Sequence, residues 1–367
     1  MSGPDEPLSR IPIRNIWFLL VYAHGLMAVR GRFDAAVDDV PDDAPLAALL
    51  ARLLATAVER RIRRSLTRGY VRREAVLARV RGRIDVMRTE SRRLLDLGRV
   101  ACRFDEMTAD TPRNRYIRAA LVHVAGAAGV PAELGARCLG LSREMERTGV
   151  ALVRATARSL AAEQIGRNDA DDRLMLEAAR LALELTLPAE DAGPRAVGRA
   201  ERCEVFLRRL FESAVGGFYR AHLPRAEGWR VATGGPLDWD PREATPGLAV
   251  LLPGMRTDIV IDRGDRRLVI DTKFTTIVHT SRFGREILKS GHLYQLYAYL
   301  RSQEGRGSAL DDRASGLLLY PSVGAPIDES VILQGHRLRF ATVDLTASST
   351  DIASKLLDLA SSKNERT

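Results

Sequence analysis

The sequence contains very little lysine: of its 56 basic residues only four are lysines, and arginine supplies the rest. Arginine stays protonated and presents a planar fork, whereas lysine is a compact donor on a flexible stem whose pKa shifts readily. A lysine in such a chain therefore indicates a position that needs lysine chemistry. One of the four, Lys273, closes the triplet Asp271-Thr272-Lys273 directly after the apolar run Leu268-Val269-Ile270.

Cysteine and long apolar runs are also scarce. The three cysteines, at positions 102, 138 and 203, are odd in number, and no histidine stands at zinc-like spacing. This argues against a disulfide framework or a zinc finger and predicts buried free thiols. The longest strongly apolar stretch near the start, Ile16 to Ala23, is too short to span a membrane, and the N-terminus is acidic rather than basic. We expect a cytoplasmic protein with no membrane partner.

No G-x-x-x-x-G-K-[ST] phosphate loop and no recognisable base-reading module occur in the sequence. The chain is therefore not expected to hydrolyse nucleotides itself. Its 367 residues, 46% hydrophobic and 28% charged, are typical of a globular protein large enough for two or three domains.

The net charge of +9 is concentrated in one segment. Residues 51–100 hold fifteen arginines against five acidic residues, so the remainder of the chain is close to neutral. Arginines that neutralise phosphates supply the sequence-independent part of nucleic-acid affinity, and the segment therefore suggests DNA or another acidic partner. A second interpretation stays open, in which Arg60, Arg61, Arg63 and Arg64 form a solvated helix face.

The surroundings of the triplet predict a β-hairpin. Residues 257–262 alternate polar and apolar side chains, Gly264-Asp265 has turn chemistry, and residues 267–270 are β-branched or aliphatic. In such a hairpin, Asp258 and Asp271 lie at the same end of the sheet. These two carboxylates and the carbonyl of Thr272 form an oxygen-rich ligand set suited to Mg²⁺, with Mn²⁺ expected to substitute.

Flanking patterns predict further elements. Helical spacing over residues 201–219 indicates a helix before the hairpin, residues 285–300 a second helix after it, and residues 316–320 a following strand. An acid, a gap of thirteen residues and then acid-x-lysine, within the order helix, strands, helix, strand, is the signature of the PD-(D/E)XK nuclease fold. We therefore expect a mixed α/β chain with a C-terminal core of this restriction-endonuclease type.

Several colinear blocks resemble a more specific family. Residues 251–261, 268–274 and 292–300 are similar to successive blocks of the McrC family, the endonuclease subunits of McrBC modification-dependent restriction systems, and residues 11–23, 81–85 and 104–115 extend the likeness toward the N-terminus. His24 and Phe274 depart from the family pattern, which favours an aromatic residue and Tyr at these two places. Neither departure touches the proposed metal ligands.

The resemblance implies a DNA endonuclease that hydrolyses phosphodiester bonds with Mg²⁺. Asp258, Asp271 and Thr272 would hold the metal, and Lys273 would orient or help deprotonate the attacking water. Gln295, which shares a helix face with Tyr299, is a further candidate for positioning water or phosphate, and Glu212 for adding a carboxylate. Plain surface roles for Gln295 and Glu212 stay open.

The family also implies partners and a domain plan. An McrB-like AAA+ GTPase forming a hexameric ring would supply the motor and the recognition of modified cytosine, while this chain would cut double-stranded DNA and stimulate GTP hydrolysis. Residues 1–110 are expected to form an Arg-rich mixed α/β domain that docks on the ring, residues 111–199 a helical region with a linker, and residues 200–367 the nuclease domain.

Two other functions remain compatible with the sequence. One is an autonomous Mg²⁺-dependent nuclease for DNA repair or junction processing, which would need no motor. The other is a non-catalytic adaptor that binds and activates a GTPase ring through its N-terminal half. The intact set of Asp258, Asp271 and Lys273 argues against the adaptor.

Overall fold

The computed structural model describes residues 11–27, 37, 41, 44–153, 170–186, 199–239, 243, 245–280, 286–322 and 326–361. The chain forms two compact units, one comprising Met1–Ala44 with Ala192–Thr367 and the other Pro45–Asp191. This division differs from the three consecutive zones predicted from the sequence. The start of the chain belongs with its C-terminal part because helix α1 (Ile13–Ala23) packs along helix α9 (Arg199–His222).

Helix α1 is formed by the apolar segment near the start of the chain. Its aromatic side chains are buried, and Tyr22 hydrogen-bonds through its hydroxyl to Nε2 of His222 at 2.8 Å. At the other end of the helix, the Asn15 side-chain amide donates to the backbone carbonyl of Leu345 at 2.8 Å. Helix α1 is thus held by both α9 and the C-terminal segment, which explains why it is not a free tail.

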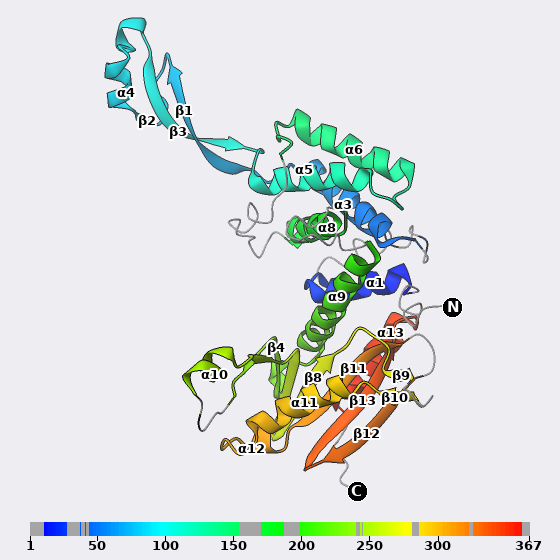
Figure 1. Ribbon diagram of the computed structural model, residues 1–367. Helices are drawn as coiled ribbons and strands as arrows, with labels where there is room; N and C mark the ends of the chain where they lie inside the picture. The colour runs from blue at the N-terminus through cyan, green and yellow to red at the C-terminus, as the bar shows by residue number, and fades with distance from the viewer. Residues whose placement is uncertain are drawn as a thin grey trace. The chain divides into compact units, whose positions relative to one another are not determined.

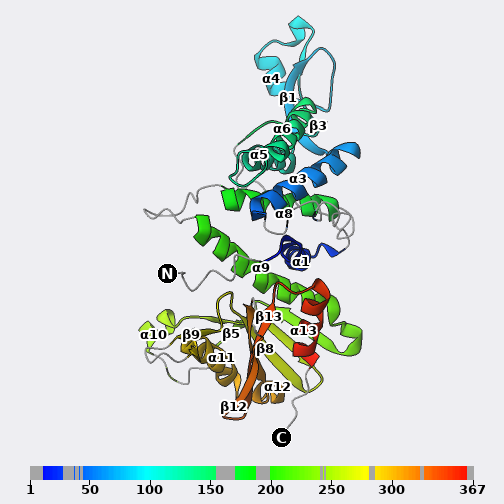
Figure 2. The same cartoon turned by 90° about the vertical axis from the view of Figure 1, so that its right-hand side faces the viewer.

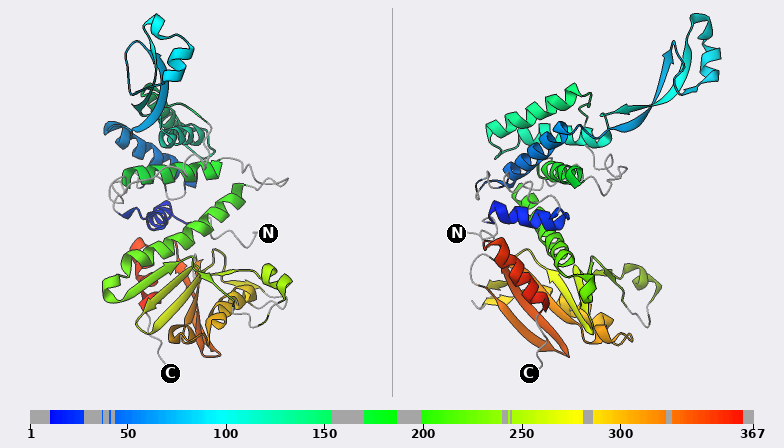
Figure 3. Two further views of the ribbon diagram at one scale, coloured as in Figure 1. Left: turned by 90° about the vertical axis from the view of Figure 1, so that its left-hand side faces the viewer. Right: turned by 180° about the vertical axis from the view of Figure 1, so that it is seen from behind.

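The centre of this unit is a six-stranded mixed sheet in the order β12-β13-β11-β8-β7-β4. The strands are β4 (Trp229–Thr233), β7 (Ile259–Arg263), β8 (Arg266–Thr272), β11 (Ser315–Ser322), β12 (Asp328–Leu333) and β13 (His336–Asp344). Strands β7 and β8 pair antiparallel, whereas β11 runs parallel to both β8 and β13. Helix α11 (Ser290–Gln303) and helix α13 (Ser349–Ser361) cover opposite faces of this sheet (Figures 2 and 3).

Most predicted elements around the hairpin are confirmed. The helix over 201–219 is α9, the hairpin is β7–β8, and the strand over 316–320 is β11. The start of the second helix was wrong: residues 286–288 form strand β10 (Glu286–Leu288), paired with β9 (Val278–Thr280), and α11 begins only at Ser290. Its N-cap residue, Lys289, still has extended backbone angles, so the helix begins only at the next residue.

Smaller elements complete the unit. They are η4 (Arg225–Glu227), β5 (Pro236–Leu237), α10 (Pro246–Leu251), β6 (Met255–Arg256) and α12 (Ala309–Asp312). Strands β4, β12 and β13 and helix α13 were not predicted, although β13 is buried along most of its length. The predicted linker, residues 188–199, lies outside the described residues except for Arg199.

Within the described residues, the second unit is built on helices α3 (Leu46–Arg63), α5 (Pro112–Ala125), α6 (Ala132–Arg147) and α8 (Ala170–Thr186). Pro112 occupies the first turn of α5, and Thr111 caps it by accepting from the Asn114 N–H. Asp172, only 1% exposed, ion-pairs with Arg61 at 2.9 Å and with Arg113 at 2.6 Å. Arg61 is therefore an internal ion-pair partner rather than part of a solvated face.

A β-arm projects from these helices (Figure 1). Its antiparallel strands are β1 (Gly69–Leu77), β2 (Arg83–Ile84) and β3 (Val100–Thr108), and its tip carries α4 (Val86–Ser91) and η3 (Leu95–Leu97). Gly82 turns the chain at φ 69°, where a Cβ would lie 2.5 Å from the Arg103 carbonyl oxygen. Only glycine fits that close approach.

Two further sequence predictions can be compared with the structure. Cys102 and Cys138 are buried free thiols, as predicted; the side chain of Cys203 lies outside the described residues. Among the helices that the structure describes, none is both long and apolar enough to cross a membrane.

The contact between α1 and α9 gives a test of the fold. A Cβ at Gly217 in α9 would overlap the Tyr22 carbonyl oxygen, so Gly217→Ala is expected to destabilise the chain by about 1–3 kcal/mol despite the better helix propensity of alanine. Gly140→Ala in α6 is the matched control, because nothing lies within 4 Å of a Cβ there. Thermal unfolding measures both variants, and equal melting temperatures would contradict the close approach.

Candidate active site

The β7–β8 hairpin brings the predicted acidic residues to one end of the sheet. Gly264, at φ 61°, and Asp265 form its two-residue turn, and the register pairs Ile259 with Ile270. Asp258 therefore stands directly before β7, opposite Asp271 near the end of β8. Successive strand residues alternate between faces, so Asp258, Asp271 and Lys273 all belong to the face that α11 covers.

Asp258 ties the two strand ends together. Its Oδ2 accepts hydrogen bonds from the backbone N–H of Thr272 at 2.7 Å and from the Thr272 hydroxyl at 2.8 Å. The N–H and C=O of one strand residue point to the same side, so the Thr272 carbonyl points toward Asp258 as well. Oxygen atoms of two carboxylates and one carbonyl therefore gather at this end of the hairpin.

Asp271 is almost fully buried, with 1% of its side chain exposed, and the Lys273 ammonium lies 2.7 Å from its Oδ2. Burial raises the pKa of Asp271 to about 6; Lys273 opposes this rise and Asp258 adds to it. The protein thus keeps a carboxylate where its negative charge is poorly solvated. A divalent cation between Asp271 and Asp258 would relieve both the burial and the repulsion, so the donor set fits a hard metal ion.

Lys273 is positioned by a chain of hydrogen bonds from α11. Its ammonium donates to Gln295 Oε1 at 2.8 Å, and Gln295 Nε2 lies 2.5 Å from the Tyr299 hydroxyl. Gln295 and Tyr299 are one helical turn apart, on the same face of α11, as predicted. Gln295 therefore contacts the catalytic candidate itself rather than lying on a solvated helix face.

Glu212 projects from α9 and is exposed to solvent. Partial desolvation raises the pKa of Glu212, and the charges of Asp258 and Asp271 add to that rise, while Arg256 and Lys273 oppose it. Glu212 is thus within electrostatic range of the two acids. It does not complete a metal-binding cluster, because no three His, Cys, Asp or Glu side chains of the described residues are disposed to share an ion.

Two polar pairs beside Lys273 were missed from the sequence. Lys289 donates to the Thr275 hydroxyl at 2.6 Å, and His292 Nδ1 lies 3.0 Å from the Tyr320 hydroxyl. Burial, followed by the charges of Lys273 and Lys289, lowers the pKa of His292 to about 4, so its imidazole is neutral near pH 7. The scarcity of lysine was the one signal that pointed to Lys289.

Two sequence comparisons find similarity to McrBC restriction-system proteins. A family model described as "McrBC 5-methylcytosine restriction system component" matches residues 17–192. The chain is 26% identical to the Escherichia coli K12 protein "Type IV methyl-directed restriction enzyme EcoKMcrBC", over 97% of this chain and 98% of that protein.

One solved structure is similar to this chain in fold. It is a chain in the half-complex of Thermococcus gammatolerans McrB AAA+ hexamers with bound McrC, 15% identical, with a TM-score of 0.52 over 89% of this chain and 72% of that one. The chain is thus similar to McrBC 5-methylcytosine restriction system components, in the family model over residues 17–192 and in the Escherichia coli relative over most of its length.

Proposed function

We propose that the chain is the DNA endonuclease subunit of a GTP-dependent, modified-cytosine-directed restriction system, with a nuclease core of the PD-(D/E)XK type. The observation that carries this proposal is the convergence of Asp258, Asp271 and Lys273 at one end of the β7–β8 hairpin. Relatives supply the system: the matched family is described by 5-methylcytosine restriction, and the similar Escherichia coli protein is called methyl-directed.

Asp258, Asp271 and the Thr272 carbonyl would hold Mg²⁺, or Mn²⁺ in its place. When bound, such an ion polarises the scissile phosphate and lowers the pKa of a coordinated water. Lys273, fixed between Asp271 and Gln295, orients the attacking water and stabilises negative charge on the phosphate oxygens. Glu212 would add negative charge near the two acids, whose own charges help to raise its pKa.

The partner in this proposal is an McrB-like AAA+ GTPase ring, the kind of protein named in the similar complex. The β-arm is suited to a protein contact because its tip exposes apolar side chains: Met87 is 82% exposed, and Leu97 is 70% exposed. Exposed arginines surround them, and a mixture of Met and Arg with apolar residues is typical of protein interfaces. We therefore assign the ring-docking role predicted for residues 1–110 to this arm.

Cleavage tests the site and the rival functions together. Methylated and unmethylated plasmids are incubated with Mg²⁺ and GTP, using this chain with and without the GTPase. We expect cutting of methylated DNA only with the GTPase, and a loss of at least about 100-fold in Lys273→Ala.

Lys355→Ala is the control for that loss, because Lys355 lies on α13, away from the site, and ion-pairs with Asp328 of β12. Cutting by the chain alone would support an autonomous nuclease. Cutting that survives Lys273→Ala would refute the proposed site and leave the adaptor.

Metal binding is tested by stability without any catalysis. Because the folded-state pKa of Asp271, about 6, lies above its unfolded value near 3.8, wild-type stability falls as pH rises from about 4 to about 6. Asp271→Asn removes this penalty, so in EDTA at pH 8 it is expected to raise the free energy of unfolding by up to about 3 kcal/mol, with no gain below pH 4. Added Mg²⁺ should stabilise only the wild type; equal stabilisation of both proteins would place the ion elsewhere.

The docking role of the arm has a separate test. The double variant Met87→Glu/Leu97→Glu is expected to lose binding to the GTPase ring and stimulation of GTP hydrolysis, because charges replace apolar contacts, while its melting temperature stays unchanged. Tyr70→Ser is the matched control, since Tyr70 is equally exposed but lies at the base of the arm. Undiminished stimulation by the double variant would show that the tip does not dock.

A further inference from the structure

The sheet face that carries the two acids continues away from them toward β4. Along β7, Asp258, Val260 and Asp262 alternate onto this face, and the register places Val260 beside Ala232 of β4 and Asp262 beside Arg230. Helix α11 packs over the neighbouring Val269 of β8, in the same hydrophobic cluster. Val260 lies at the margin of that cluster and packs against it.

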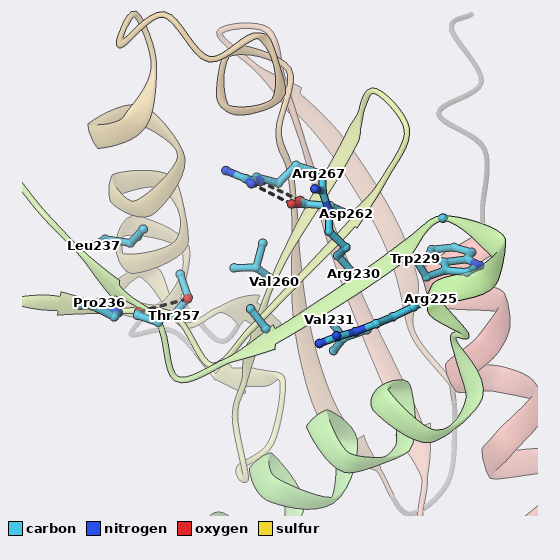
Figure 4. Close-up of a pocket in the computed structure, with 13 residues that line it drawn as sticks. Arg225, Trp229, Arg230, Val231, Pro236, Leu237, Thr257, Val260, Asp262 and Arg267 are labelled. Atoms are coloured by element: carbon cyan, nitrogen blue, oxygen red, sulfur yellow. Dashed lines mark hydrogen bonds and ion pairs between the residues drawn. The ribbon is translucent and has the colours of Figure 1, made fainter.

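A pocket of about 1010 Å³ occupies this part of the face (Figure 4). Val260 and Ala232 form part of its apolar floor, and Pro236 and Leu237 form one wall. Thr257 lines it as well, and Thr257 directly precedes Asp258 in the chain. The pocket therefore reaches the residue that directly precedes Asp258, one of the candidate metal ligands.

The charge of this pocket is positive at its rim. Arg267 is neutralised by Asp262, through two contacts of 2.8 Å, and by Asp311 at 2.5 Å. Arg225 and Arg230 also line the pocket, are exposed, and form no ion pair with any described residue. Two uncompensated guanidinium groups beside an apolar floor suit a ligand with phosphates on one side and apolar surface on the other.

We infer that this pocket binds the DNA strand that leads away from the scissile phosphate, with Arg230 and Arg225 contacting its backbone phosphates. The inference rests on the proposed nuclease function and adds a substrate-binding site to it. Four residues along β7 separate Asp258 from Asp262, which corresponds to about 13 Å. Phosphates of one DNA strand rise about 3.4 Å each along the duplex axis, so Arg230 would contact a phosphate within about four nucleotides of the cut.

The test is DNA binding measured by fluorescence anisotropy, with the full chain, a 20-base-pair duplex, and Ca²⁺ in place of Mg²⁺ to prevent cleavage. Arg230→Ala and Arg225→Ala are each expected to raise Kd by about 3- to 30-fold. Each should also reduce the slope of log K against log salt by about 0.9, as the loss of one phosphate contact requires.

Lys355→Ala, which removes one positive charge from α13, is the control and should change neither quantity. A shorter duplex that ends at the cleavage position does not extend into the pocket. It should therefore bind the wild type and both arginine variants equally. The inference would be overturned if, on the 20-base-pair duplex, the arginine variants had the same affinity and the same salt slope as Lys355→Ala.

Cleavage kinetics separate this inference from the proposed function. Arg230→Ala should raise KM and leave kcat nearly unchanged, whereas Lys273→Ala should abolish cleavage but retain binding in Ca²⁺. If Lys273→Ala still cuts, the proposed function fails. If Lys273→Ala is inactive while Arg230→Ala binds and cuts like the control, only the pocket assignment fails. Melting temperatures of both variants exclude misfolding as the cause.

Discussion

The antiparallel register of β7 and β8 is the constraint on which the site depends. It places Asp258 opposite Asp271 and allows Asp258 to accept two hydrogen bonds from Thr272. A shift of one residue would turn Asp271 to the opposite face, away from Lys273 and α11. Gly264 in the two-residue turn and the apolar pairs along both strands hold this register, so the geometry of the acids is a property of the hairpin rather than of a flexible loop.

The energetic consequence of that register is a carboxylate whose negative charge is poorly solvated. Asp271 is nearly excluded from water, and its raised pKa shows that Lys273 only partly offsets the burial. Such a site is less stable than an apolar one of the same shape, and a cation would recover the difference. The buried charge of Asp271 therefore lowers the stability of the metal-free protein. Measurements of metal binding and of unfolding consequently both report on Asp258 and Asp271.

Sequence patterns predicted the local parts of this fold and missed the non-local ones. The hairpin, α9 and the buried α1 follow from short-range alternation, helical spacing and apolar content, and Gln295 with Tyr299 from a spacing of four. Strand β13 was missed because it forms through pairing with β11 and β12, which local alternation of side chains does not record. The start of α11 was placed too early because pairing with β9 makes residues 286–288 extended.

The composition of the chain explains which site residues could be identified from the sequence. In a chain so rich in arginine, individual arginines carry little information, and only the structure distinguishes the internally paired Arg61 and Arg267 from the exposed Arg230. Lysine is different, because two acceptors within 2.8 Å of one nitrogen, Asp271 and Gln295, suit a compact ammonium better than a planar fork. The rare lysine can therefore be identified from the sequence as a site residue. The abundant arginines can be distinguished only by their ion pairs in the structure.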